Sequence, residues 1–265
     1  MDRKKILLTC ITIFLFIIVL ILSFLFFKRV TLKQNFENDI LSFINKNDNT
    51  IFQIDKIVFF SSCDAENKST SGTNFTIQNL YQFTDIAIFL KSPLIEKNSE
   101  NILKRVYIDN IKYNKLPLIG EPELYYKNIN SFAKSEFIED NLITNKLEFN
   151  ITSKDIANLD TPTLYNNLAN PIVLSYVNNN IKNNYTFTDI STQITYDGSL
   201  LKKCSVLLPD LTCNISFDIY IVNHLDQEFK CTIYLDIPLE IQEQSIYNGN
   251  ITFTQDSNLT FYRYK

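Results

Sequence analysis

LTCNISFDIYIVNHLDQEFKCTIYLDIPL, residues 211–239, contains two runs in which apolar and polar side chains alternate. The apolar residues are Leu211, Cys213, Ile215, Phe217, Ile219 and Ile221 in the first run, and Phe229, Cys231, Ile233, Leu235, Ile237 and Leu239 in the second. Successive side chains of a β-strand point to opposite faces, so each run predicts a strand with one buried face. A slip of one residue would turn a whole apolar set to solvent. We therefore predict an antiparallel hairpin in which odd-numbered residues oppose odd-numbered residues, closed by NHLDQE.

From residue 50 onward, β-branched and aromatic residues dominate short runs that Asn, Asp, Ser and Pro separate. Runs of this composition are typical of strands. They are IFQIDKIVFF, NFTIQNL, DIAIFL, KRVYIDNIKY, KLEFNIT, PIVLSYV, NYTFTDI and QITYDG. The fold class that we predict is mainly β, an antiparallel β-sandwich-like domain over residues 49–265.

Two features bear on how this β region is divided. Asp197-Gly198 and Asn248-Gly249 are turn signals between strand-like runs. Residues 115–170 fit the strand pattern less well, and we expect a short helix there near DIANL or TLYNNL. The length of the region allows one large unit or two smaller ones with a boundary near residue 150.

Residues 6–27, ILLTCITIFLFIIVLILSFLFF, carry no charge, no glycine and no proline. A helix of this length rises about 33 Å, enough to cross a hydrocarbon core of about 30 Å. A cleaved signal peptide has a shorter apolar region and small residues at the cleavage site. Here the run ends in Phe26-Phe27-Lys28-Arg29 instead. We predict a retained transmembrane helix behind a short tail of residues 1–5.

Residues 28–48 follow the apolar run and have a different pattern. Leu32, Phe36, Ile40 and Ile44 recur every four residues among polar side chains. This spacing predicts a juxtamembrane amphipathic helix or stalk.

The charges that flank the apolar run do not set its orientation. Arg3, Lys4 and Lys5 on one side are balanced by Lys28, Arg29 and Lys33 on the other, so the positive-inside count is a tie. Long domains translocate largely regardless of their own charge. We therefore expect a signal anchor of a single-pass cell-membrane protein, with the N-terminus inside and an extracellular C-terminal domain.

The charge of the region beyond the anchor bears on its partners. After residue 33 the chain has 19 basic residues (25 minus 6) and 28 acidic residues (29 minus 1), a net charge of −9. Nucleic-acid binding depends on clustered Lys and Arg, so this composition argues against a nucleic-acid partner. The membrane itself, and a protein or an envelope component outside it, are the partners that we expect.

The cysteines allow two interpretations. Cys204 and Cys213 flank SVLLPDLT, which resembles a strand, a turn and a strand, and a four-residue loop would place the two thiols opposite each other. The pair is therefore either a disulfide, with Cys63 and Cys231 as a second pair, or two small buried thiols. The sequence has one histidine and no C-x-x-C pair, so we expect no zinc or other metal site.

One motif suggests catalysis. Leu211-Thr212-Cys213 resembles the cysteine motif of sortases, membrane-tethered β-barrel transpeptidases that use Cys, His and Arg. The resemblance would make Cys213 a nucleophile and His224 its partner. This chain departs from the family because His224 follows the cysteine instead of preceding it. Cys213 also belongs to the apolar face, where a thiolate is disfavoured.

No other segment carries the pattern of a catalytic or cofactor site. No P-loop, G-x-G-x-x-G, G-x-S-x-G, H-E-x-x-H or EF-hand loop is present, and we expect no cofactor. The acidic clusters Glu121-Pro122-Glu123 and Glu136 to Asp140 have no partner motif, and we expect them to be solvated. We nominate no catalytic residue.

The function that the sequence favours is therefore a membrane-anchored, non-catalytic β domain that binds a ligand. Outward-facing Tyr220, Tyr234, Lys230, Asp218 and Asp236 offer a contact surface, although a solvated sheet face has the same composition. An accessory subunit of a membrane or envelope assembly is the alternative, and a transpeptidase-like cysteine enzyme is a more remote one.

Overall fold

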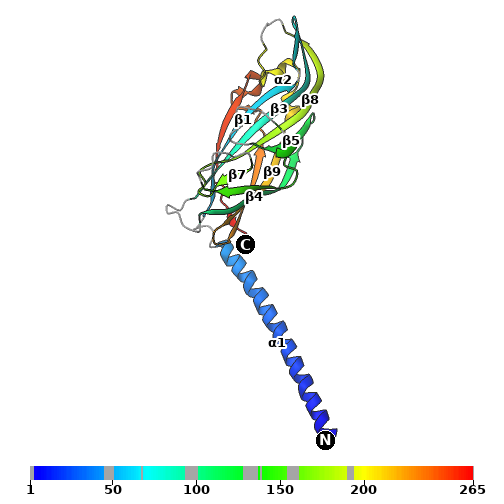
Figure 1. The fold of residues 1–265 in the computed structure, drawn as a ribbon, viewed down its shortest axis with the longest axis vertical. Helices are drawn as coiled ribbons and strands as arrows, with labels where there is room; N and C mark the ends of the chain where they lie inside the picture. Colours follow the sequence, from blue (N-terminus) through cyan, green and yellow to red (C-terminus); the bar gives the residue numbers. More distant parts are fainter. Residues whose placement is uncertain are drawn as a thin grey trace. The chain divides into compact units, whose positions relative to one another are not determined.

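The computed structural model describes residues 3–44, 51–66, 68–92, 101–127, 137, 139–153, 161–189 and 194–264. The chain forms two compact units, residues 1–49 and residues 50–265. The first unit is a helix and the second consists mainly of antiparallel strands (Figure 1). The predicted fold class, a mainly β region with an apolar N-terminal helix, is confirmed.

The N-terminal unit contains one continuous helix, α1 (Arg3–Ile44). Its 42 residues give a length of about 63 Å. From Ile13 to Phe27 the described side chains are apolar apart from Ser23, and none is buried. Among the described residues, Ile13–Asn38 is long and apolar enough to cross a membrane. Residues 28–44 continue α1 without a break, and residues 45–48 lie outside the part that the structure describes.

The larger sheet of the second unit, which we call sheet A, contains the long strands of the fold. Its order is β13 (Ile251–Asp256), β1 (Gln53–Glu66), β3 (Asn74–Lys91), β8 (Ile172–Thr188) and β5 (Glu121–Tyr126), and β2 (Ser69–Ser71) pairs with β3. NFTIQNL and DIAIFL, predicted as separate strands, are the two halves of β3, and PIVLSYV and most of NYTFTDI form β8 in the same way. The interruption expected between them is a bulge: the register shifts between Leu80 and Gln82, opposite Asn180, whose φ is 56°.

The second sheet, sheet B, contains the predicted hairpin. Its order is β14 (Tyr262–Arg263), β10 (Glu228–Asp236), β9 (Asn214–Asn223), β4 (Leu103–Lys115), β6 (Leu147–Thr152) and β7 (Thr163–Tyr165). Ile221 lies opposite Phe229, and Ile215 lies opposite Leu235, so the predicted odd-to-odd register is confirmed. β11 (Glu240–Ile241) and β12 (Gln244–Ser245) form a separate two-stranded ribbon.

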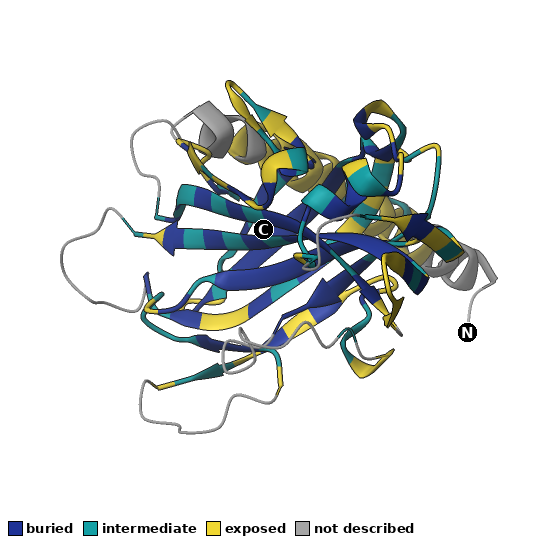
Figure 2. Cartoon of the chain, turned by 90° about the horizontal axis from the view of Figure 1, so that it is seen from above, coloured by how far each residue is buried: buried dark blue, intermediate teal, exposed yellow. Residues whose placement is uncertain are grey.

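One half of the inner face of sheet A packs against sheet B. This first core contains Phe59, Ile86 and Tyr176 from sheet A and Phe217 and Ile233 from sheet B, all of them buried. Sheet B packs here because the alternation of apolar and polar residues gives β9 and β10 one continuous apolar face. Figure 2 shows the buried residues concentrated on the strands.

The other half of the long strands packs against short helices instead. Figure 1 places α2 (Ser199–Lys203) beside the upper ends of β1, β3 and β8. This second core joins Cys63 and Leu80 of sheet A to Leu200 of α2, Leu211 of η4 (Leu208–Leu211) and Ile246 of η5 (Ile246–Asn248). The two cores therefore lie along the same strands but are closed by different elements.

The segment that enters this second core corrects two strand predictions: the described part of QITYDG, residues 194–198, is not a strand, and the strand expected at Cys204 is replaced by α2. Helix α2 begins at Ser199 after its N-cap Gly198, and the Asp197 side chain, one residue earlier, accepts a hydrogen bond from the Ser199 N–H at 2.9 Å. Gly198 approaches Gly249 so closely that a Cβ there would lie 2.2 Å from the Gly249 carbonyl oxygen. The two predicted turn signals thus meet each other at the α2–η5 contact instead of closing hairpins.

The prediction of a short helix in the middle of the chain is also wrong for TLYNNL, the part of it that the structure describes. TLYNNL forms β7 followed by a turn, because Thr163–Tyr165 pairs in parallel with β6 and buries Leu164. DIANL, residues 155–159, lies outside the described residues.

A belt of polar side chains separates the two cores on the inner face of sheet A. Ser61 and Thr84 share a hydrogen bond at 2.8 Å, and the Gln82 Nε2 donates to the Thr84 hydroxyl at 2.8 Å. Asn178, opposite Gln82 on β8, donates to the carbonyl oxygen of Ile119 at 2.9 Å. All four side chains are fully buried, so the belt divides the apolar interior in two.

Candidate functional site: a groove between two sheet edges

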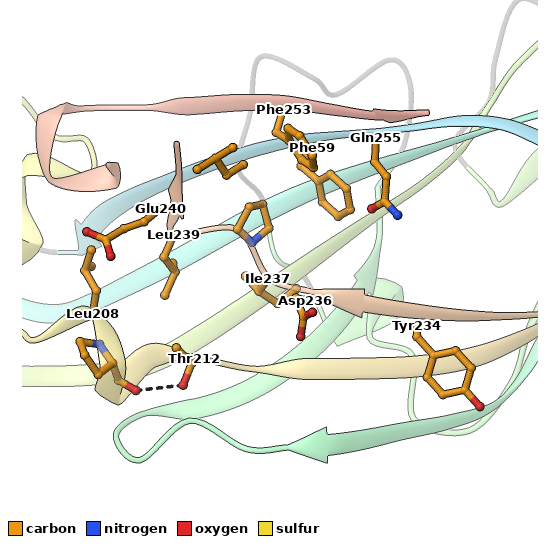
Figure 3. Close-up of a pocket in the computed structure, with 13 residues that line it drawn as sticks. Phe59, Leu208, Thr212, Tyr234, Asp236, Ile237, Leu239, Glu240, Phe253 and Gln255 are labelled. Atoms are coloured by element: carbon orange, nitrogen blue, oxygen red, sulfur yellow. Dashed lines mark hydrogen bonds between the residues drawn. The ribbon is translucent and has the colours of Figure 1, made fainter. Parts of the chain in front are cut away.

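A cavity of about 550 Å³ lies between the outer edge of sheet A and the end of β10 (Figure 3). We call it the groove. Its lining is Phe59, Phe253 and Gln255 from sheet A, Leu208, Pro209 and Thr212 at η4, and residues 234 and 236–241 of the segment that leaves β10. The groove is therefore built from parts of the chain that are far apart in sequence.

The wall of the groove that sheet B supplies forms because β10 cannot continue. Ile237 still donates its N–H to the carbonyl oxygen of Cys213 at 3.0 Å. The pairing with β9 ends here, and Pro238, which has no backbone N–H, cannot donate to a strand on the open side. The chain then turns through Leu239, which packs into the second core, and enters the β11–β12 ribbon. The side of the sandwich is left open between β10 and β13.

Apolar side chains form the floor of the groove. The rings of Phe59 and Phe253 are stacked, with centroids 6.0 Å apart and an angle of 20° between the planes. Phe59 and Ile237 belong to the first core, whereas Leu208 and Leu239 belong to the second. The groove thus lies over the boundary between the two cores, where these four side chains are buried and Phe253 is half-buried.

Both sheets present a free edge at the groove. Within the described residues, β13 pairs with β1 alone, and β14 covers β10 only at Phe229 and Lys230. The rest of β10, as far as Asp236, has no neighbouring strand on that side in the described part of the chain. Two sheet edges that face one gap are unusual, because unpaired strand edges are usually covered or blunted.

The direction of the free backbone groups on β10 follows from one hydrogen bond. The Tyr264 N–H donates to the carbonyl oxygen of Glu228 at 2.6 Å, on the side of β10 away from β9. The N–H and C=O groups of an antiparallel strand alternate between its two sides. The even-numbered residues therefore direct their backbone groups to the open edge, and beyond β14 these are Thr232, Tyr234 and Asp236.

The charge of the groove is negative. Asp236 and Glu240 line it, and no Lys, Arg or His does so among the described residues. The Asp236 Oδ1 accepts a hydrogen bond from the Asn214 Nδ2 at 2.7 Å, which fixes the carboxylate beside the end of β10. Tyr234, 68% exposed, lies at the other end of the same wall (Figure 3).

Three leucines on the segment before Gly120 and at the start of η4 are exposed. Leu116, Leu118 and Leu207 are 57%, 79% and 62% exposed. The Leu118 N–H donates to the Asp210 carbonyl oxygen at 2.7 Å, which holds this loop against η4, whose Leu208 and Pro209 line the groove. Clustered exposed apolar side chains mark contact surfaces more often than isolated ones do.

The structure does not bring Cys204 and Cys213 together. Both are free thiols; Cys204 lies in the second core at the end of α2, and Cys213 lies in the first core before β9. The strand register that would have placed them opposite each other is wrong, because residues 199–203 are helical. Cys63 and Cys231, the other candidate pair, are also free and likewise lie in different cores.

The residues that resemble a sortase motif are also apart. His224 is exposed in the β9–β10 turn, at the opposite end of β9 from Cys213. Ten strand residues separate the two, which corresponds to roughly 30 Å. Burial raises the pKa of the Cys213 thiol, and the side chain is only 3% exposed. At this separation His224 cannot act as a base for the Cys213 thiol.

The outward face of sheet B is an internally bonded network. Asp218 accepts hydrogen bonds from Lys230 at 2.8 Å, from Thr232 at 2.6 Å and from Asn110 at 2.7 Å. Burial alone would raise the pKa of the Asp218 carboxyl, but these hydrogen bonds outweigh it, so the pKa lies below its ordinary value. The Tyr220 ring stacks on Tyr107, with centroids 4.6 Å apart. Of the five outward residues predicted, only Tyr234 and Asp236 also line the groove.

The sheet A side of the groove was not predicted from the sequence. Phe59 lay in a predicted strand, but nothing in its run identifies a partner almost two hundred residues later. A signal for β13 was present, because Ile251 and Phe253 alternate with polar residues directly after Asn248-Gly249. The described residues contain no cluster of three or more His, Cys, Asp or Glu that could hold a metal ion.

Comparisons with known proteins do not assign the groove. No protein-family model, curated protein or solved structure matches the chain. The interpretation of the site therefore rests on its geometry.

Proposed function

We propose that this protein is a single-pass membrane protein whose β unit is a non-catalytic binding module, and that the groove is its binding site. The observation that carries the proposal is an apolar gap of about 550 Å³ between two free sheet edges. A cavity of this size with an apolar lining and few polar groups is typical of a ligand site. The ligand is a protein or an envelope component outside the cell.

The cysteine chemistry supports a non-catalytic role. Catalytic thiols need a lowered pKa and access to the substrate. Here burial raises the pKa of the Cys204 thiol to about 11 and that of Cys231 to about 12. Cys63 and Cys213 are buried as well. The four described thiols therefore have the properties of packing residues.

Site-specific photo-crosslinking tests the binding site. A photoreactive residue at Gln255, in the groove, is compared with one at Asn183, exposed on β8, in the full chain in cell membranes. We expect a discrete adduct from position 255 alone, and we expect Thr212→Trp, which fills the groove, to abolish it. Adducts that are equal from both positions, or that survive Thr212→Trp, would contradict the proposal.

Protease treatment of intact cells tests the topology. The β unit should be digested without permeabilisation if it lies outside. Protection until the membrane is opened would place it inside. A single integral membrane protein crosslinked in equal amount through residues 13–27, with no adduct from the groove, would favour the accessory-subunit alternative instead.

A further inference from the structure

The open part of β10 has the properties of a strand acceptor. Its positions from Cys231 to Asp236 span about 20 Å, and three of them direct N–H and C=O groups to the edge beside the groove, where no strand of the described part of the chain pairs with them. A small molecule would satisfy one or two of these groups. An extended polypeptide would satisfy all of them, because its own backbone repeats at the same spacing.

The groove floor specifies what such a polypeptide carries. A strand added to β10 continues sheet B, so its alternate side chains point to the inner face, toward Phe59, Phe253 and Ile237. We therefore expect the inward-pointing side chains of the added strand to be apolar. Phe253, Pro238 and Ile241 are only half-buried at this floor, so apolar side chains placed here would remove their remaining apolar surface from water.

The charges specify the other side chains. Asp236 and Glu240 lie on the groove wall without a basic residue in the described lining, and the chain beyond residue 33 has a net charge of −9. An acidic segment would be repelled, and a second copy of β10 would bring another Asp236 to the same edge. A basic segment from a different chain is therefore favoured over self-pairing.

We infer that the groove binds an extended polypeptide segment of a partner protein, which pairs as an additional strand along the outer edge of β10 and carries alternating apolar and basic side chains. This inference rests on the proposed function and names the ligand class for the same site. Lys230, covered by β14, and Pro238 limit the segment to about six residues.

Backbone pairing is tested by one pair of variants. Tyr234→Pro removes an N–H that has no partner strand, so it leaves the pairing with β9 intact and is tolerated at an edge. Tyr234→Thr removes the same ring but keeps the N–H. The comparison of the two variants therefore isolates the backbone hydrogen bond from the side chain.

The probe is a blocked peptide of about seven residues that alternates lysine and valine, titrated into the purified full chain in detergent micelles. We expect saturable binding that is about tenfold or more weaker to Tyr234→Pro than to Tyr234→Thr. The same peptide with glutamate in place of lysine should not bind. Hydrogen exchange should slow at the amides of Thr232 and Tyr234 when the lysine peptide is bound.

Several outcomes overturn the inference. Equal affinity of the two Tyr234 variants, or no binding of the lysine peptide, would contradict strand addition. If circular dichroism shows that Tyr234→Pro does not fold, a lysine–valine peptide with N-methylated backbone amides decides instead, and its undiminished binding to the unmodified protein would count against pairing. Dimerisation of the chain through β10 would replace the partner with a second copy.

The crosslink from Gln255 distinguishes failure of the strand-addition inference from failure of the proposed binding site. If the crosslink from Gln255 forms normally in Tyr234→Pro, the groove still binds a partner but not by strand addition. If no crosslink forms from Gln255 in any variant, the groove is not the binding site and the proposed function fails with it.

Discussion

The first core and the second core share the strands β1, β3 and β8 but are closed by different kinds of structure. Sheet B closes the first core with two strands whose every second side chain is apolar. Short helices and connecting segments close the second core with a few leucines and isoleucines. Continuous pairing ties each closing strand to its neighbours, whereas α2 spans only five residues. We therefore expect the first core to determine global stability and the second to open locally.

The largest effect should follow from removing an aromatic ring of the first core. Phe217 is fully buried on β9, and Phe217→Ala should lower the free energy of unfolding by about 3–5 kcal/mol. Chemical denaturation of the full chain, followed by circular dichroism, measures this change. Leu225→Ala, in the exposed β9–β10 turn, is the control and should cost less than about 0.5 kcal/mol. Similar losses of unfolding free energy for Phe217→Ala and Leu225→Ala would show that β9 does not determine the stability of the first core.

A matched pair of leucines compares the cores directly. Leu235 in the first core and Leu200 in the second are both buried, and Leu→Ala in a core costs about 2–5 kcal/mol. We expect Leu235→Ala to have the larger cost, because α2 can shift to fill the space that Leu200→Ala leaves. Denaturation of both variants gives the two costs. The reverse order would mean that the second core is the better packed one.

The thiols are internal probes of local opening. Cys63 and Cys204 lie in the second core, and Cys213 and Cys231 lie in the first. Because burial raises the pKa of these thiols, alkylation at neutral pH requires opening of the core. In mild denaturant we expect Cys204 to be alkylated about tenfold faster than Cys213, as measured by mass spectrometry in a Cys10→Ser background. Equal rates would show that both cores open in one cooperative step.

The smallest effect concerns the polar belt between the cores. The Gln82 Oε1 is buried without a hydrogen-bond partner among the described residues, whereas its Nε2 donates to Thr84. Gln82→Leu removes both the unpaired oxygen and this hydrogen bond, so the two effects offset and stability should change by less than about 1 kcal/mol. Thr84→Val, by contrast, removes the hydroxyl that bonds Ser61 and Gln82 and should cost about 1–3 kcal/mol. Thermal denaturation of the two variants separates them. A large loss for Gln82→Leu would mean that its amide has a further bonding role.

The comparison also explains which parts of the fold could be predicted. The hairpin register was predictable because Ile215 and Leu235 belong to sets whose period is visible within ten residues. The α2 region was not, because the run around Cys204 has too few residues to show a period of 3.6 or of 2. Tertiary contact with η5 and the side chain of Asp197 decided it. The groove was predictable only in part: Tyr234 and Asp236 were predicted to belong to a contact surface, but Phe253 was not.

By itself, the sequence determined the elements that depend on local pattern: an apolar helix long enough to cross a bilayer, and strands with one buried face. Only the tertiary structure decided which strand edges remain open, which thiols share a core, and that Phe59 and Phe253 meet over one groove. The physical reason is that side-chain periodicity is set by the geometry of neighbouring residues. Strand order, by contrast, depends on contacts between segments that lie up to two hundred residues apart, and no local pattern records them.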